Sequence, residues 1–321
     1  MNLMLQITTR KMTPTIDYPA VVEYTNKQAN IFWTAEEIKV EKDKQDILVN
    51  MTESERHAVI TTLKLFTKYE MIIGEEFWIE RVMKWFPRPE IQAMASLFGA
   101  VELSIHAPFY RKINEELNLA TDEFYTSYTT DPVLSDRIKF LDGLLGHDDI
   151  AKALGAFTFG EGAILYSSFA FLKHFQSQGK NKLLNVVAGI NFSARDEALH
   201  SEAAGWLFQQ YASEAGLDLE EYEKYFTEVA VKVLEHEVAI IEKLFEKGDI
   251  EGITKTQMVS FVKSRINVCM RNMGFSNIHK VDYNPVSEWF YKGINGYAMN
   301  DFFVSIGNQY QRNWSGEGFT Y

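Results

Sequence analysis

Four glutamates and two histidines interrupt the apolar faces of four long stretches of helical periodicity. They are Glu70, Glu102, His106, Glu161, Glu197 and His200. An ionised side chain without a partner is costly to bury, so these six positions need a common partner. Two metal ions would provide one, because carboxylates bridge and neutralise hard cations while imidazole completes each coordination shell. The pattern therefore predicts a dinuclear metal site in the core of a helical bundle.

The two histidines follow a glutamate at different spacings. Glu197 and His200 are three residues apart, which is the Glu-x-x-His spacing of four-helix dinuclear proteins. Glu102 and His106 are four residues apart, and Pro108 follows them closely. Proline lacks an N–H group and clashes with the carbonyl four residues earlier, inside this turn. We therefore predict a kink or π-bulge between Glu102 and His106 that absorbs one extra residue.

The donor set does not distinguish iron from manganese, because the same oxygen and nitrogen ligands accept both metals. We expect a di-iron centre first, with a manganese pair or a mixed manganese/iron pair as alternatives. Tyr110 follows His106 by one helical turn, so we expect its ring beside the metals rather than across the bundle.

Helices must position these side chains, and the sequence predicts helices throughout. Long stretches follow the α-helical period, the chain has only seven prolines, and no run alternates in the manner of strands. The fold class is therefore all-α, with a polar connection at Thr121–Asp136. Six helices are expected. The first begins at the capping box Thr52-x-x-Glu55, the second begins near Pro89, and the third spans about 150–178. The fourth runs from Val186 to Gly216, the fifth runs from Leu219 to Lys247, and the sixth follows Thr254-x-x-Gln257.

Two other clusters of acids and histidine have a structural interpretation. Glu235-His236-Glu237 falls on a charged amphipathic helix and is expected to lie on its solvated face. His147-Asp148-Asp149 is typical of a turn or a helix cap. Neither cluster is assigned to the metal site.

Composition argues against several other classes of protein. The chain has 321 residues, with 32 Lys+Arg against 44 Asp+Glu and a net charge of -12, so its surface would repel a nucleic-acid backbone. Cys269 is the only cysteine, which excludes an internal disulfide and indicates a reducing, cytoplasmic location. There is no apolar run long enough to span a membrane and no secretory leader pattern, so we expect no membrane association.

The last part of the sequence differs from the rest. From Asp301 to Tyr321 the periodicity is lost, and glycine, asparagine, serine and aromatic residues accumulate. We therefore expect one metal-binding domain over residues 1–300 and a flexible tail over residues 301–321. An apolar-ended tail suits docking into the groove of a partner protein.

Two strings resemble a known family, and the resemblance extends over nearly the whole chain. Phe32-Trp33-Thr34-Ala35-Glu36-Glu37 and Arg195-Asp196-Glu197-Ala198-Leu199-His200 are similar to segments of the small, radical-generating β subunit of class I ribonucleotide reductase. The resemblance implies a ferritin-like bundle that forms a homodimer. It also implies that Glu70, Glu102 and His106 hold one metal, that Glu161, Glu197 and His200 hold the other, and that Glu102 and Glu197 bridge them.

The same resemblance implies a radical path. Tyr110 matches the tyrosine that the metal site oxidises to a stable radical, and Trp33 and Asp196 match relay residues near the metals. Tyr310 resembles the interface relay of the manganese-using branch, and the end of the tail resembles an anchor for the large α subunit. In the family, the radical is relayed to that subunit, which reduces ribonucleotides to deoxyribonucleotides.

Two other functions share the predicted fold. A ligand-binding oxidase would use the metals to oxidise a bound lipid or small molecule, but it has no need of a relay through Trp33 and Asp196. A ferritin-like iron store would form an oligomeric shell, and it has no use for Tyr110 beside the metals. Nucleotide binding by this chain itself is not expected, because it has no phosphate-binding Gly-x-x-x-x-Gly-Lys-Ser/Thr loop.

Overall fold

The computed structural model describes residues 6–294, and every regular element among them is helical. The all-α prediction is confirmed. The predicted tail at residues 301–321, which includes Tyr310, lies outside the described residues. The division between a domain and a tail therefore stays a prediction.

Turns, 3₁₀ segments and irregular stretches connect the helices of the described part, and π-helical segments interrupt several of the helices. A further helix begins at residue 285, and its described part ends at residue 294. The α-helices are α1 (Pro19–Asn30), α2 (Glu53–Met71), α3 (Met83–Trp85), α4 (Pro89–Val101), α5 (Ala107–Glu116), α6 (Asp122–Thr126), α7 (Pro132–Leu145), α8 (Ile150–Phe159), α9 (Tyr166–Lys173), α10 (Leu184–Ala215), α11 (Leu219–Leu244) and α12 (Lys255–Asn272). The π-helical segments are Asp46–Asn50, Ile72–Val82, Glu102–His106 and Gly160–Ile164.

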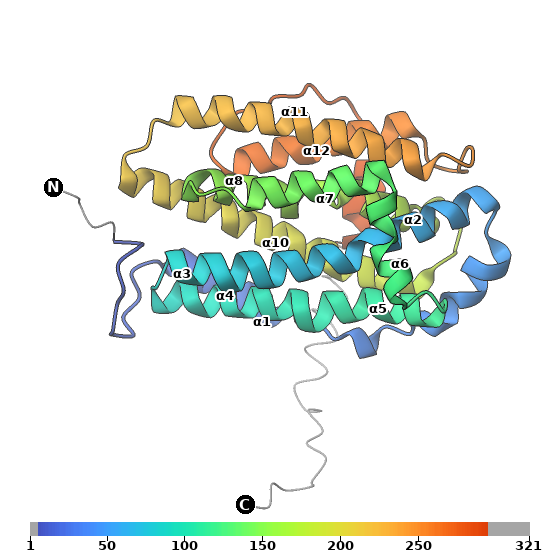
Figure 1. The fold of residues 1–321 in the computed structure, drawn as a ribbon, viewed down its shortest axis with the longest axis horizontal. Coiled ribbons are helices and arrows are strands. Elements are labelled where there is room, and N and C mark those ends of the chain that lie inside the picture. The colour runs from blue at the N-terminus through green and yellow to red at the C-terminus, as the bar shows by residue number, and fades with distance from the viewer. Residues whose placement is uncertain (1–5, 295–321) are drawn as a thin grey trace, which may run out of the picture.

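Four long helical rods carry the six predicted metal ligands. Three are composite: the π segment Ile72–Val82 joins α2 to α3, Glu102–His106 joins α4 to α5, and Gly160–Ile164 leads from α8 towards α9. The fourth is α10, which is a regular α-helix of 32 residues. The rod from α2 to α3 and the rod from α4 to α5 lie side by side and run in opposite directions (Figure 1).

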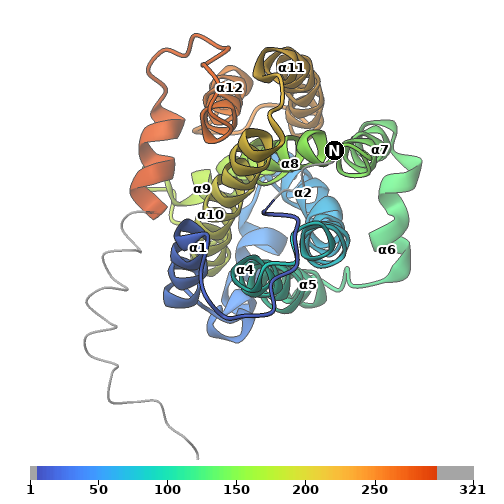
Figure 2. The same cartoon turned by 90° about the vertical axis from the view of Figure 1, so that its left-hand side faces the viewer.

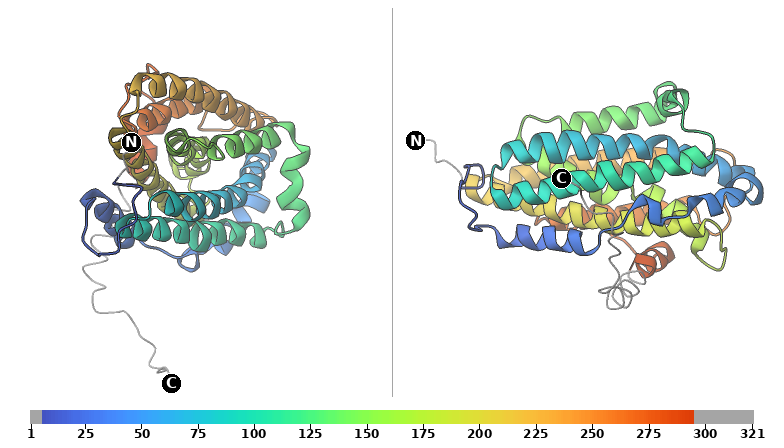
Figure 3. Two further views of the ribbon diagram at one scale, coloured as in Figure 1. Left: turned by 60° about the vertical axis from the view of Figure 1, so that its left-hand side comes forward. Right: turned by 90° about the horizontal axis from the view of Figure 1, so that it is seen from below.

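The remaining helices cover these rods. α11 and α12 lie next to each other on the side of the bundle away from α4 and α5, as the end-on view shows (Figure 2). α1 packs against α4 and α10, at the edge of the bundle away from α7 (Figure 3). Apolar side chains from all of these helices form one buried core, and the six predicted ligands lie within it.

Local signals in the sequence begin and end the helices as predicted. The Thr52 amide donates to Glu55 Oε2 at 2.9 Å, and the Glu55 amide donates to Thr52 Oγ1 at 3.2 Å, which completes the capping box of α2. Thr254 and Gln257 form the same box at α12. Gly216 ends α10 with φ of 62°, a left-handed conformation that glycine adopts without a steric penalty.

The predicted polar connection Thr121–Asp136 is largely helical. It contains α6, a 3₁₀ turn and the first residues of α7. Polar side chains act here as helix caps, since Thr121 Oγ1 accepts from the amide of Phe124 at 3.2 Å and Asp131 Oδ1 accepts from that of Val133 at 3.0 Å. Helix α1 was not predicted either. The predicted cap at His147–Asp149 is confirmed, because Asp149 Oδ1 accepts from the amide of Lys152 at 3.1 Å.

The prediction that Glu235-His236-Glu237 lies on a solvated face is wrong for Glu237. Its side chain is fully buried and forms an ion pair with Arg137 of α7, which is also buried. A buried carboxylate needs such a partner, and the partner lies a hundred residues away in the sequence.

Among the described residues, none of the helices combines the length and apolarity that crossing a bilayer requires.

Candidate metal centre

The six predicted ligands meet at one place in the core, and all of them are fully buried. They form two overlapping groups, and within each group one donor atom per side chain lies within 4.8 Å of the others. Glu102 and Glu197 belong to both groups, which is the position that bridging carboxylates require. The first group is Glu70, Glu102, His106 and Glu197, and the second is Glu102, Glu161, Glu197 and His200.

The backbone changes from α to π at or next to three of the four glutamates. Glu70 is the penultimate residue of α2, two residues before the π segment Ile72–Val82 begins. Glu102 begins the π segment Glu102–His106, and Glu161 lies inside Gly160–Ile164. Glu197 is the one glutamate of the four that is distant from any π segment along the chain, since it lies within the regular helix α10.

The predicted π-bulge between Glu102 and His106 is confirmed. The amide of Ala107 donates to the carbonyl of Glu102, five residues earlier, which is the hydrogen bond that defines a π-turn. A π-turn holds about one residue more than an α-turn, so a four-residue step here is equivalent to a three-residue step in an α-helix. His106 Nδ1 therefore comes within 2.9 Å of Glu102 Oε2. His200 Nδ1 lies 2.7 Å from the other oxygen of Glu102.

A glycine allows the two composite rods to approach at the cluster. A Cβ atom built on Gly74 would lie 2.8 Å from the Cβ of Glu102 and 2.9 Å from Cγ of Leu103, which is closer than carbon atoms approach. The absence of a side chain at Gly74 thus brings Glu102 close to the rod that carries Glu70.

The outer nitrogen of each histidine has a polar partner. His106 Nε2 lies 3.1 Å from Asp196 Oδ2, and this oxygen also accepts a hydrogen bond from Trp33 Nε1 at 2.8 Å. His200 Nε2 lies 3.1 Å from Gln28 Oε1. These acceptors hold the ring proton on Nε2 and leave both Nδ1 atoms free to bind a metal.

Gln28 and Trp78 were not among the predicted site residues, yet both contact the cluster. Trp78 Nε1 donates to Glu161 Oε1 at 3.2 Å. Gln28 lies on α1, which begins at Pro19 and buries Val21, Tyr24 and Gln28 at steps of three and four residues. That start signal and that spacing would have predicted α1 and a polar residue on its buried face.

The donor atoms of the cluster fit metal ions better than they fit one another. Hydrogen-bond partners are missing among the described residues for both oxygens of Glu70, Glu102 and Glu197, for Glu161 Oε2, and for Nδ1 of both histidines. Unsatisfied buried donors and acceptors are costly, and so many in one place require an explanation. Four carboxylates carry the charge that two divalent cations would neutralise, so a dinuclear metal site fits the residues present.

The pKa shifts of the cluster also indicate that its side chains need bound cations. Burial raises the pKa of Glu70 and Glu197 well above the usual value. Burial lowers the pKa of His106 and His200, but the charge of Glu102 and the contacts with the other surrounding carboxylates together outweigh this effect and raise both pKa values well above the usual value. Without metals the cluster therefore retains protons, and bound cations would replace them.

Tyr110 is fully buried on α5, one turn beyond His106. Its hydroxyl donates to Ser193 Oγ at 3.2 Å, and its ring stacks on Phe66 with centroids 4.5 Å apart. Burial, and then the charge of Glu70, raise the pKa of Tyr110 well above the usual value. The hydroxyl is therefore protonated at neutral pH.

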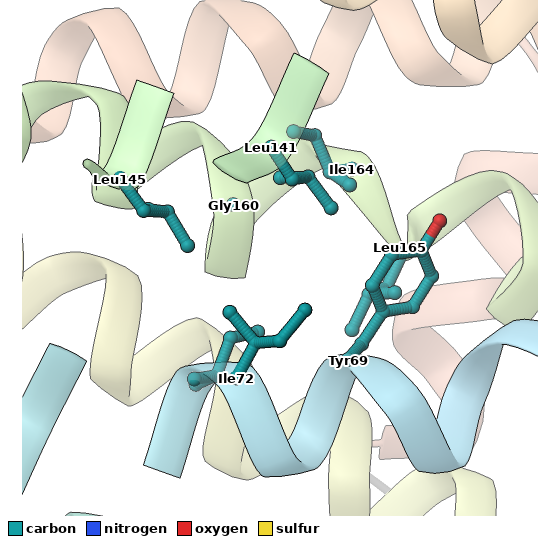
Figure 4. A pocket seen from close by; sticks show the side chains of 8 residues that line it. Tyr69, Ile72, Leu141, Leu145, Gly160, Ile164 and Leu165 are labelled. Atoms are coloured by element: carbon teal, nitrogen blue, oxygen red, sulfur yellow. The ribbon is translucent and has the colours of Figure 1, made fainter. Parts of the chain in front are cut away.

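A small apolar cavity is lined in part by the residues that directly precede two of the glutamates (Figure 4). Tyr69 of α2 directly precedes Glu70, and Gly160 directly precedes Glu161. The rest of the lining is aliphatic and comes from α7, from the two adjoining π segments and from Leu165. Its volume of about 10 Å³ is close to the minimum that holds one water molecule. This cavity is too small for a lipid substrate.

A family model and individual relatives match this chain over most of its length, and their descriptions agree with one another. A protein-family model described as "Ribonucleotide reductase, small chain" matches residues 10–285. A probable ribonucleoside-diphosphate reductase small subunit of Invertebrate iridescent virus 3 is 24% identical, over 92% of this chain and 83% of the relative. The ribonucleoside-diphosphate reductase subunit beta of Bacillus subtilis is 23% identical, over 90% of this chain and 88% of the relative.

Solved structures show the same fold. The dimanganese(II)-NrdF of Streptococcus sanguinis superposes with a TM-score of 0.78 at 20% identity, covering 89% of this chain and 99% of that one. The ribonucleotide reductase R2 subunit of Clostridium botulinum gives a TM-score of 0.77 at 21% identity, covering 89% of this chain and 91% of that one.

Proposed function

Because the chain belongs to the ribonucleotide reductase small-chain family, we propose that its buried cluster binds two metal ions and that Tyr110 becomes a stable radical beside them. The chain is a small subunit of ribonucleoside-diphosphate reductase, an oxidoreductase. The proposal concerns which of its residues generate and transmit the radical.

The observation that carries the proposal is the set of unpartnered donor atoms in the core. Carboxylate oxygens and imidazole nitrogens converge there without hydrogen-bond partners of their own. One metal would be held by Glu70, Glu102 and His106, and the other by Glu161, Glu197 and His200, with Glu102 and Glu197 as bridges.

Metals held there would supply the one-electron oxidation of tyrosine, which protein side chains alone do not perform. Iron is our first candidate for both positions. Manganese is the next to test, alone or paired with iron, because the Streptococcus sanguinis protein of the same fold is described as dimanganese(II).

The surroundings of Tyr110 suit the formation of a lasting radical. In this step Tyr110 would give one electron to metal ions that an external oxidant has oxidised, and its hydroxyl proton would leave through Ser193 Oγ, its hydrogen-bond partner. Ser193 Oγ orients the hydroxyl, and Phe66 covers one face of the ring. Full burial excludes water and other reductants from the ring.

A continuous contact path leads from the cluster to Trp33. His106 contacts Asp196, and Asp196 accepts the indole N–H of Trp33, which is 2% exposed. We propose that this path relays the radical towards a large α subunit. Tyr310 would continue the relay and the tail at 301–321 would dock that subunit, in a complex where the small subunit is a homodimer.

The direct test is reconstitution of the metal-free protein with Fe(II), with Mn(II) and with both, followed by exposure to oxidant. Metal is counted per chain, and the radical is recorded by electron paramagnetic resonance (EPR). Two metals and a tyrosyl signal are expected, and Tyr110→Phe should abolish the signal while keeping the metals.

Tyr166→Phe is the matched control, since Tyr166 is equally buried but donates its hydroxyl to the carbonyl of Ala194. It should keep the signal. Two metals without a radical under any oxidant would favour the ligand-binding oxidase, and iron far above two per chain would favour a store.

A further inference from the structure

The π-turn that carries Glu161 contacts two buried arginines from distant parts of the chain. Arg265 of α12 donates from Nε to the carbonyl of Gly162 at 2.9 Å. Arg137 of α7 donates from Nη2 to the carbonyl of Ile164. The exposed fractions of Arg265 and Arg137 are only 3% and 2%, so both guanidinium groups lie in the core.

Both guanidinium groups are themselves held in place. Arg137 forms an ion pair with Glu237 of α11. Arg265 donates from Nη1 to the hydroxyl of Tyr291 at 2.8 Å, and its guanidinium lies 3.8 Å from the ring centroid of Tyr166. A planar guanidinium fixed at several points offers donors in a defined direction. The two arginines are therefore rigid partners for the turn.

The turn between them is closely packed at Gly162. A Cβ atom on Gly162 would lie 2.3 Å from Ser201 Oγ on α10 and 2.4 Å from Cys269 Sγ on α12. The turn is thus pressed against α10 and α12, while its carbonyls are bound from α7 and α12. Its shape depends on all of these contacts, and Glu161 lies within it.

Global stability alone is a weak reason to keep two charged groups in a core. Replacing a buried ion pair by apolar residues of similar size is often neutral or stabilising. The charged donors do offer hydrogen bonds to backbone carbonyls that an apolar side chain could not make. Their specific effect is on the conformation of Gly160–Ile164.

We propose that Arg137 and Arg265 are positioning residues that hold this π-turn in the shape that presents Glu161 to its metal. The inference deepens the proposed metal centre and rests on it. It assigns the two arginines a role at one metal position, the one shared by Glu161 and His200, and none at the position of Glu70 and His106.

The test uses full-length variants. Arg265→Leu removes one contact, and the double variant Arg137→Leu/Glu237→Leu removes the other without leaving an unpaired charge. Arg265→Lys keeps a charged donor and should restore part of the effect. Tyr291→Phe is the matched control, because it removes a partner of Arg265 but leaves the bond to Gly162.

Two measurements are made on each variant. Mn(II) titration of the metal-free protein, followed by EPR, should show one of the two sites weakened about 10- to 100-fold while the other keeps its affinity. Amide hydrogen exchange in the metal-free protein should accelerate at residues 160–165 and stay unchanged in α10. The control should behave as the unmodified protein.

Unchanged exchange at residues 160–165 in both the Arg265→Leu and the double variant would overturn the inference. Equal weakening of both metals together with faster exchange throughout the chain would also overturn it, since that result indicates a general structural role. If the unmodified protein binds no metal pair, the proposed function fails. Hydrogen exchange in the metal-free variants would still decide whether the arginines hold the turn.

Discussion

The two glutamate–histidine pairs reach one cluster through different backbones. Glu197 and His200 are three residues apart on the regular helix α10, whereas Glu102 and His106 are four apart within a π-turn. Both histidines nevertheless place Nδ1 within 3 Å of a Glu102 oxygen, at 2.9 and 2.7 Å. The comparison teaches that the site depends on where the donor atoms lie and not on the number of residues between them. A helix can contain one extra residue between two ligands if a π-turn accommodates it.

The two pairs also differ in their outer partners. His106 contacts Asp196, a carboxylate that is hydrogen-bonded to Trp33. His200 contacts the neutral amide of Gln28 on α1. The cluster is therefore nearly symmetric in its donor atoms and asymmetric in its surroundings. Only the His106 side is connected to the indole that we propose as a relay.

The largest effect is expected from deleting Ala198, between Glu197 and His200. α10 has no π-turn there, so the deletion rotates all later residues of the helix by about 100°. His200 would leave the cluster, and buried residues such as Leu207 would leave the core. Equilibrium dialysis with Mn(II) should show that stoichiometric binding of the pair is lost. Retention of two Mn(II) per chain would contradict the view that α10 cannot accommodate a change in the number of residues between Glu197 and His200.

Asp196→Asn should have the next largest effect, on the His106 side. The variant loses the charge that holds the His106 ring, and outer-partner changes of this kind reduce metal affinity about 10- to 100-fold. Mn(II) titration by EPR should show one weakened site and one unchanged site. Asp136→Asn, at an exposed position on α7, is the control for removing an acid. An equal loss at both sites would argue against separate surroundings for the two pairs.

Gln28→Leu should affect the His200 side less, because a neutral acceptor stabilises the ring less strongly than a carboxylate does. We expect a loss of about tenfold or less in the affinity of that site, measured by the same titration. A loss larger than that of Asp196→Asn would reverse the proposed order of the two outer partners.

The smallest effect is expected from removing the extra residue in the π-turn. Deletion of Ser104 together with Pro108→Ala turns the segment into a Glu-x-x-His pair on a helix that no longer contains the proline. Because the π-turn only absorbs the added residue, the flanking helices keep their phase and both metals should bind as before. Dialysis compares this variant directly with the Ala198 deletion. Loss of a metal here would show that the π-turn itself shapes the site.

The sequence was sufficient to predict which acids and histidines gather in the core, and to predict one of the π-turns beside them. Buried acids and histidines on apolar helix faces are visible in the periodicity, and Pro108 indicates the bulge after Glu102. The π-turn at Gly160–Ile164 contains no proline, so no local sequence signal predicted it. Its shape depends instead on contacts with Arg137 and Arg265.

The remaining misses concern partners that lie far apart in the sequence. Gln28 is 172 residues from His200, and Arg137 is 100 residues from Glu237. A charged residue on an amphipathic helix looks solvated until its distant partner is known. Periodicity therefore predicts which residues are buried more readily than it predicts which polar groups satisfy one another.

The most direct test is anomalous diffraction at the manganese edge from crystals of Mn(II)-loaded protein. We predict two anomalous peaks per chain inside the helical bundle. One should be bound by Glu70 and His106, the other by Glu161 and His200, and both should be bound by Glu102 and Glu197. A single peak, no peak in the bundle, or peaks at other residues would contradict the dinuclear centre.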